Sequence, residues 1–214
     1  MDWPANVNEQ DLVVRTGQIL SSKNGDFGIG AVLFSRVRET SKVVVVQKSK
    51  KDGYEFGGYW AVPGGMTRVT NDEESVEVCV RNSLVARVEA ETGLVFAPNK
   101  IDHRLLFRQP LVSSYHVEGE RKYTVVLPFF TSVDACTELT PNDASIDAAK
   151  WTDWPLEWEL FAPVNRVILA RVFWPTMSVF ERRNARGTVA TAIDQICCWS
   201  ELIGLPRIST NWLT

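Results

Sequence analysis

A glycine-rich turn, GGYWAVPGG at residues 57–65, precedes a helix-compatible stretch that closes on ETGL at residues 91–94. Apolar side chains recur every four residues along this stretch, at Val76, Val80, Leu84 and Val88. This spacing predicts an amphipathic α-helix from about residue 71, whose acidic first turn (residues 72–74) suits the positive end of the helix dipole. Gly93 predicts the end of the helix, because glycine readily adopts the left-handed conformation found there.

Strand-compatible segments surround this helix. The pattern predicts strands in FGIGAVLFSRV, KVVVVQKS, WAVPGG, LVFAP, HRLLFRQ, YTVVLPFFTS and AAKWTDW. The unbroken run VVVV is typical of a strand buried on both faces. Two helical segments follow, at residues 165–183, where Pro175 interrupts the pattern, and at residues 188–204. The chain is therefore predicted to be an α/β protein, an α/β/α sandwich with a mixed central sheet and added C-terminal helices.

The boundary between these parts is predicted at residue 162. Residues 1–162 would form the α/β domain, and residues 163–214 a helical extension packed on the same domain. We expect this extension to cover the core or to form a homodimer.

Composition narrows the classes of partner. The net charge of −3 and the pI near 5.5 provide no general attraction to nucleic acid, which we do not expect as a partner. Four cysteines without CxxC spacing, and an N-terminus unlike a signal peptide, predict a cytoplasmic protein. No apolar run is long enough to span a membrane. The basic run KSKKDGY (Lys48–Tyr54) is interpreted as a solvated hairpin tip in preference to a phosphate-binding loop.

Two histidines are too few and too far apart for a histidine-rich metal site, so carboxylates would have to hold any metal. Carboxylates select hard ions such as Mg²⁺ or Mn²⁺. Acids on a helix face beside a glycine-rich turn could hold such ions against a diphosphate and activate water.

WAVPGG followed by an acidic helix that closes on ETGL resembles the Nudix box, and the likeness extends over residues 27–155. The resemblance implies a Nudix-like fold and metal-dependent hydrolysis of a nucleoside diphosphate linked to another group. The sequence departs from the family pattern in three places. Ala86 replaces the family arginine, while Arg87 and Ala90 replace metal-binding glutamates. The stretch from Gly65 to Gly93 is also longer than the family pattern, by about two helical turns.

Site residues follow from this resemblance. Glu91 is the one metal-binding carboxylate that stays in register, and it is predicted to act in catalysis with Glu77. The metal ligands would be Glu91, the Gly65 backbone and Asp147. The predicted substrate-binding residues are Arg87, Trp60, Gly64 and Arg68. Arg87 could pair with Glu91 one turn away, or bind phosphate in place of a metal.

Three functions remain open at this point. The first is a Nudix-type hydrolase that uses Mg²⁺ or Mn²⁺ and acts on a nucleotide-type small molecule. The second is a Nudix-like domain that has lost hydrolysis and binds a nucleotide as a sensor or regulator, which the substitutions at residues 87 and 90 favour. The third is a scaffold for protein interaction.

Overall fold

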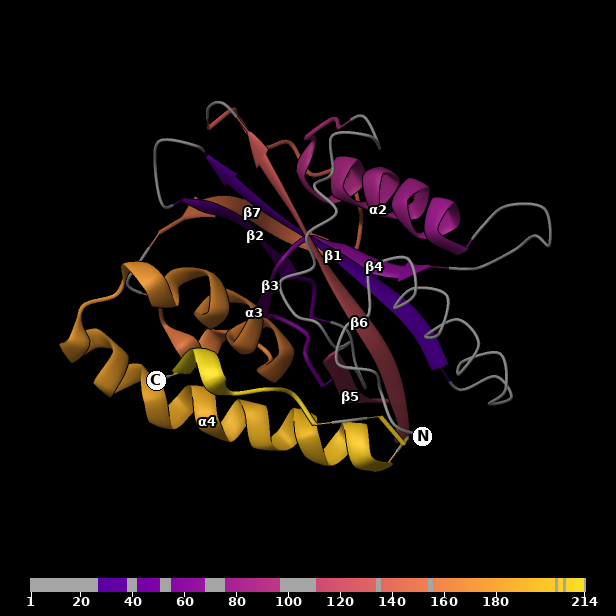
Figure 1. Ribbon diagram of the computed structural model, residues 1–214. Helices are drawn as coiled ribbons and strands as arrows, with labels where there is room; N and C mark the ends of the chain where they lie inside the picture. The colour runs from indigo at the N-terminus through magenta and orange to yellow at the C-terminus, as the bar shows by residue number, and fades with distance from the viewer. Residues whose placement is uncertain are drawn as a thin grey trace.

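A computed structural model describes residues 27–37, 42–50, 55–67, 76–96, 111–133, 136–153, 156–202, 204–205 and 207–213. Seven strands within these residues form one mixed sheet (Figure 1). Five follow the order β3-β2-β1-β6-β5, while β4 pairs with β1 and β7 with β2. The strands are β1 (Phe27–Val37), β2 (Val43–Lys48), β3 (Trp60–Ala61), β4 (Gly64–Thr67), β5 (Leu111–Val117), β6 (Glu120–Val133) and β7 (Ile146–Thr152).

The pairing of β1 with β6 is parallel, and every other strand pair is antiparallel. Along the parallel pair, Phe27 lies opposite Tyr123 and Val37 opposite Val133. Strand β2 pairs on both edges, with β3 and with β7. Its four valines are fully buried, as the unbroken VVVV run predicts.

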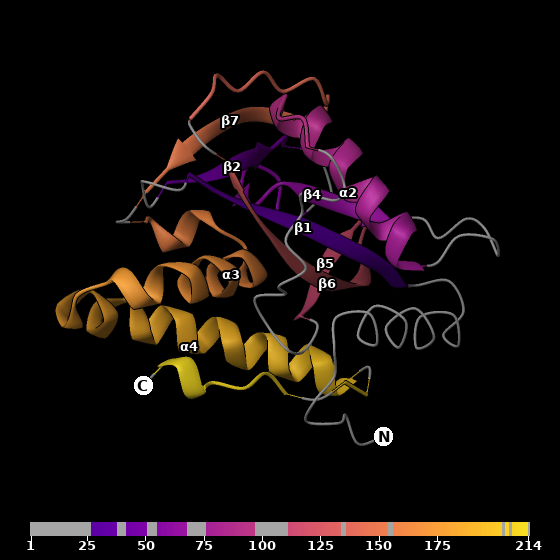
Figure 2. The same cartoon turned by 45° about the horizontal axis from the view of Figure 1, so that its top comes forward.

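Helices cover both faces of the sheet (Figures 1 and 2). Helix α2 (Val76–Thr92) lies on one face, and α3 (Pro163–Phe173) with α4 (Val179–Leu202) lies on the other. One apolar core joins α3 and α4 to valines of β2, and the large buried side chains Ile168, Leu169, Phe173 and Ile196 belong to it. The predicted α/β/α sandwich with a mixed sheet is confirmed.

Helix α2 ends as its sequence predicts. Gly93 has φ +77°, and its N–H donates to the Glu89 carbonyl oxygen at 2.7 Å. The Thr92 hydroxyl donates to the Val88 carbonyl oxygen and accepts from the Leu94 N–H. Leu84 and Val88 are buried, as expected of the apolar stripe. Residues 71–75, where the helix was predicted to begin, lie outside the described residues.

The C-terminal helices differ from their prediction in one boundary. Pro175 does interrupt the helical pattern, because α3 gives way to the 3₁₀ turn η3 (Trp174–Thr176). Helix α4 then begins at Val179 and continues through Gly187 as one 24-residue helix, so residues 179–183 belong to the second helix. Ser178 caps it in a capping box: its hydroxyl accepts from the Glu181 N–H, and the Glu181 carboxylate accepts from the Ser178 N–H.

Two predicted strands need comment. Leu94, Val95 and Phe96 form no strand, because this segment leads directly from the Gly93 turn, so the strand predicted in LVFAP is wrong within the described residues. The segment HRLLFRQ lies outside them. Strand β5, missed in the sequence, lies immediately after it and forms a hairpin with β6. The hairpin turns at Glu118 and Gly119, both with positive φ.

Two further short helical turns complete the described chain, η2 (Trp158–Leu160) and η4 (Asn211–Leu213). No helix in the described parts of the chain has the length and apolar character that crossing a membrane requires.

Candidate functional site

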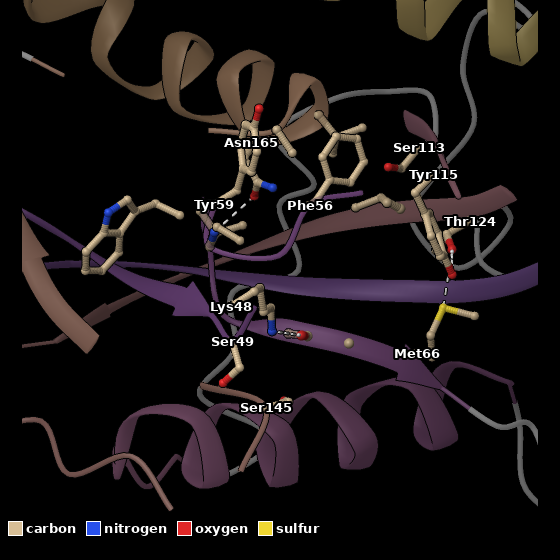
Figure 3. A pocket seen from close by; sticks show the side chains of 18 of the residues that line it. Lys48, Ser49, Phe56, Tyr59, Met66, Ser113, Tyr115, Thr124, Ser145 and Asn165 are labelled. Atoms are coloured by element: carbon tan, nitrogen blue, oxygen red, sulfur yellow. Dashed lines mark hydrogen bonds between the residues drawn. The ribbon is translucent and has the colours of Figure 1, made fainter. Parts of the chain in front are cut away.

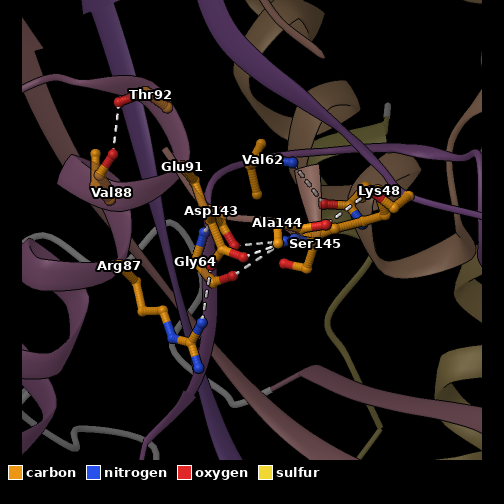
Figure 4. Close-up of polar contacts among 12 residues, drawn as sticks. Lys48, Val62, Gly64, Arg87, Val88, Glu91, Thr92, Asp143, Ala144 and Ser145 are labelled. Carbon is orange, nitrogen blue, oxygen red and sulfur yellow. Dashed lines mark hydrogen bonds and ion pairs between the residues drawn. The ribbon is translucent and has the colours of Figure 1, made fainter. Parts of the chain in front are cut away.

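A buried ion pair lies where the end of β2 meets the last turn of α2 (Figure 4). Lys48 Nζ lies 2.6 Å from Glu91 Oε1, and the other oxygen, Oε2, accepts the Gly64 N–H at 2.9 Å. The same ammonium lies 3.5 Å from the Gly64 carbonyl oxygen. The Glu91 side chain is only 2% exposed and that of Lys48 is 21% exposed. Both carboxylate oxygens therefore have partners within the protein.

Burial dominates the electrostatics of Glu91. Loss of solvent raises the pKa of its carboxyl group, whereas Lys48 and the Gly64 N–H lower it. The net direction is upward. Lys48 therefore offsets only part of the cost of holding this carboxylate away from water.

The glycine turn meets Glu91 through backbone geometry. Gly64 has φ +146°, a conformation that residues with a side chain rarely adopt, and this directs its N–H toward the carboxylate. At Gly65, an added Cβ would lie 3.2 Å from Arg87 Nε, so the arginine packs directly over the turn. The spacing between the PGG turn and the end of α2 thus places Gly64, Gly65, Arg87 and Glu91 together.

Arg87 pairs with Asp143 rather than with Glu91. Arg87 Nη1 lies 3.2 Å from Asp143 Oδ2, and Asp143 Oδ1 accepts the Ser145 N–H at 2.8 Å (Figure 4). The hydrogen bonds from Ser145 chiefly hold the pKa of Asp143 below its usual range, and Arg87 adds to this. The i, i+4 pairing that the sequence allowed for Arg87 and Glu91 is replaced by this contact with the loop before β7.

The other predicted site residues are spread around this pair. Trp60 is half-buried, and Lys150 Nζ lies 4.2 Å from the centre of its ring. Asp147 is exposed on β7 and accepts from the Ser49 hydroxyl at 2.5 Å. Glu77 lies in the first turn of α2, but its side chain, like the whole of Arg68, lies outside the described part of the chain.

The donor set around Glu91 does not fit a divalent cation. Mg²⁺ and Mn²⁺ require several carboxylate, carbonyl or water oxygens around one point. Glu91 Oε1 and the Gly64 carbonyl oxygen could bind such an ion. Both of them face the Lys48 ammonium. Across the described residues, no three His, Cys, Asp or Glu side chains come close enough together to hold a metal ion. The cationic position beside Glu91 is that of Lys48.

An open pocket of about 480 Å³ lies beside the ion pair (Figure 3). Lys48, Ser49 and Ser145 line it, together with Gly64 and Gly65. Aromatic side chains line it at Phe56, Tyr59 and Trp60, and side chains with a hydroxyl group line it at Ser113, Tyr115 and Thr124. This size is within the range of small-molecule sites, about 300–1,000 Å³.

Lys48 is the residue that the sequence interpretation missed. It was grouped with the solvated basic run 48–54, yet it is the last residue of β2 and turns inward. Its partner lies 43 positions away in the sequence. The signal available was its place at the end of a buried strand, whereas the other basic residues of the run come later.

The sequence matches no protein-family model and no curated protein. The structure does match solved ones. A bifunctional NMN adenylyltransferase/ADP ribose pyrophosphatase from Francisella tularensis, complexed with AMP and a manganese ion, matches 78% of this chain at 13% identity and a TM-score of 0.47. The match covers 47% of that protein, so this chain spans about half its length.

Two further structures are similar. The Nudix domain of Shewanella oneidensis NrtR, complexed with ADP ribose, matches at 20% identity and a TM-score of 0.46, over 75% of this chain and 98% of that one. The E. coli dihydroneopterin triphosphate pyrophosphohydrolase matches at 12% identity and a TM-score of 0.49, over 69% and 97%. Each of these matches has an identity of 20% or less and a TM-score below 0.5. They assign this chain neither a family nor a function, so its function is inferred from its own residues.

Proposed function

We propose that this Nudix-like chain binds a nucleotide-type ligand carrying a diphosphate, with the Lys48 ammonium in place of a divalent cation, and does not hydrolyse it through a metal at Glu91. The observation that carries this proposal is the 2.6 Å contact between Lys48 Nζ and Glu91 Oε1. Glu91 is the carboxylate that the Nudix resemblance assigns to the metal. A dication placed there would be repelled by the ammonium and would have to displace it from a buried partner.

Lys48 also supplies a donor to the pocket. An ammonium group has three N–H bonds. One N–H points to Glu91 Oε1, and a second makes a long contact with the Gly64 carbonyl oxygen. Among the described residues the third has no partner, and Lys48 lines the pocket. A phosphate oxygen is the acceptor that such a charged donor favours, since charge-assisted hydrogen bonds are stronger than neutral ones.

The aromatic part of the pocket suits the other end of a nucleotide. Phe56 and Tyr59 lie edge to face, with ring centres 5.7 Å apart, and both line the pocket beside Trp60. Stacking of a base on such a side chain contributes about 1–3 kcal/mol and tolerates different bases. An ammonium and aromatic rings that line the same pocket together favour a ligand with a flat ring and a phosphate group.

The test combines binding and turnover. Adenosine, AMP, ADP and ADP-ribose are titrated calorimetrically into the protein, once with a chelator and once with Mg²⁺, and each mixture is then analysed by chromatography for hydrolysis. We expect ADP to bind in the chelator, adenosine to bind more weakly, and no product to form. Lys48→Met should weaken ADP binding by about tenfold or more, the loss of one charge-assisted contact.

Two controls separate this proposal from a metal-dependent hydrolase. Lys122→Met removes another lysine, one that pairs with Glu120 away from the pocket, and should leave ADP binding unchanged. Lys48→Met combined with Glu91→Gln leaves no unpaired buried charge and should fold while still binding ADP weakly. Turnover that requires Mg²⁺ and disappears in Glu91→Gln would overturn the proposal in favour of the hydrolase.

A further inference from the structure

Asn165 brings a polar side chain from the C-terminal helices into the pocket. It occupies the third position of α3, beside Phe56 and Tyr59 in the view of Figure 3. Its Oδ1 accepts the Val62 N–H at 3.0 Å, which ties α3 to the loop between β3 and β4. No contact of this kind follows from the Nudix box, because Asn165 lies about 70 residues after it.

The Val62 contact fixes which way the amide group points. A backbone N–H can only donate, so the Asn165 atom facing it must be the amide oxygen. The amide nitrogen therefore faces away from Val62. This nitrogen has no hydrogen-bond partner among the described residues, and Asn165 lines the pocket. The two N–H donors of this nitrogen are therefore available to the pocket that Asn165 lines together with Phe56 and Tyr59.

We propose that Asn165 determines which base the pocket accepts: one that presents a carbonyl oxygen, such as a 6-oxopurine, in preference to one that presents an amino group. This rests on the proposed function, since it assumes that a nucleotide binds here. An asparagine recognises adenine best when its oxygen accepts from the N6 amino group and its nitrogen donates to N7. Here the oxygen is engaged by Val62, so an amino group would face the N–H donors of Asn165.

A pair of diphosphates tests the assignment directly. Inosine 5′-diphosphate and ADP carry the same ribose and phosphates but present a carbonyl oxygen and an amino group, respectively, at position 6. We expect the wild type to bind inosine 5′-diphosphate about tenfold more tightly than ADP, the effect of one hydrogen bond. Both affinities are measured by calorimetry in a chelator.

Asn165→Asp is the variant to compare. One carboxylate oxygen can still accept the Val62 N–H, and an acid in the first turn of α3 suits the helix dipole, so this variant should fold with an undiminished unfolding temperature. Its second oxygen replaces the N–H donors with an acceptor, which should abolish or reverse the preference for inosine 5′-diphosphate. The added negative charge repels both ligands equally, because their phosphates are identical, and so cancels in the ratio of their affinities.

The outcomes separate the two proposals. If both nucleotides bind and Lys48→Met weakens both, but Asn165→Asp leaves their ratio unchanged, the role of Asn165 is wrong and the proposed function stands. Equal binding of the two nucleotides to the wild type likewise overturns the role of Asn165. If neither nucleotide binds the wild type, both proposals fail. A ratio that favours inosine 5′-diphosphate and changes in Asn165→Asp supports them together.

Discussion

Lys48 Nζ lies 2.6 Å from Glu91 Oε1, and this contact joins the end of strand β2 to the last turn of helix α2. In the sequence, β2 precedes the glycine turn at residues 64–65 and α2 follows it. The backbone of Gly64 contacts both the Lys48 and the Glu91 side chains. The pair therefore holds three segments together at one edge of the pocket. Its removal has consequences for folding as well as for binding.

Lys48→Met should destabilise the protein by about 3 kcal/mol, because it leaves the buried Glu91 carboxylate without its cation. Glu91→Gln combined with Lys48→Met should recover part of this loss, since no buried charge is then left unpaired. The free energy of unfolding is measured with urea for the wild type, Lys48→Met, Glu91→Gln and the double variant. These four values give the coupling free energy between the two side chains. Additive effects of the two substitutions would contradict a direct interaction.

The stability contributed by Glu91 should depend on pH. Burial raises the pKa of this carboxyl in the folded protein above its ordinary value of 4.5, so the folded state binds the proton more tightly than the unfolded state. The resulting stabilisation is fully present below the ordinary pKa and is lost as the pH rises through the folded pKa. As the pH rises above 4.5, the free energy of unfolding of the wild type should therefore fall relative to that of Glu91→Gln. A difference between the two proteins that stays constant over this range would be inconsistent with a raised pKa.

The binding of an anionic ligand should follow the same titration. When Glu91 is protonated, the Lys48 ammonium is no longer neutralised by its partner, and this end of the pocket becomes more positive. Asp143, the other acid whose charge acts on Glu91, has a lowered pKa and stays ionised as Glu91 titrates. The affinity for ADP should therefore increase as the pH falls through the pKa of Glu91, and calorimetric titrations in a chelator at several pH values measure it. In Glu91→Gln, this part of the pH dependence should be absent.

Local pattern predicted much of the fold. The buried valines of β2, the position where α2 ends and the break at Pro175 follow from residues that lie within one turn or one strand of each other. Strand β5 was missed because LVSSYHV carries polar Ser113, Ser114 and His116, and its pairing with β6 is decided by the whole sheet. Register between distant strands cannot be read from such patterns.

The site was less predictable for the same reason. The Nudix resemblance implied that Glu91 and the glycine turn belong to one site, and in the structure Glu91 Oε2 accepts the Gly64 N–H. It could not indicate that Lys48 would turn toward Glu91, because the two residues are 43 positions apart in the sequence and meet only in the folded chain. Nor could it indicate that Arg87 would pair with Asp143, 56 positions away, in place of Glu91.

The end of α2 offers a prediction with a matched control. Gly93 has φ +77°, and a Cβ added there would collide with the Thr140 hydroxyl oxygen and crowd its backbone. Gly204 has nearly the same φ, +78°, but an added Cβ would meet no atom within 4 Å. Alanine at position 204 should cost about 1 kcal/mol through backbone strain alone. Alanine at position 93 should lower the free energy of unfolding clearly more, and chemical denaturation of the two variants measures the difference. Equal losses of stability would show that the contact with Thr140 carries no energy.

Removal of the Asp143 side chain should destabilise the protein more than removal of the Arg87 side chain. Arg87 is half-exposed, so Arg87→Ala should change the free energy of unfolding by less than about 1 kcal/mol. Asp143→Ala removes the acceptor of both Arg87 and the Ser145 N–H and should cost about 1 kcal/mol more. Asp143→Asn keeps an oxygen for Ser145 and is the control for that hydrogen bond.

The pH dependence of this contact has the opposite sign to that of Glu91. Because the folded pKa of Asp143 is lowered, its stabilisation is present above the ordinary value of 3.8 and is lost as the pH falls through the lower folded value. Urea unfolding of the wild type and of Asp143→Asn should therefore converge in acid, whereas the difference between the wild type and Glu91→Gln moves in favour of the wild type. If instead the Asp143→Asn difference grew on acidification, the folded pKa of Asp143 could not be lowered.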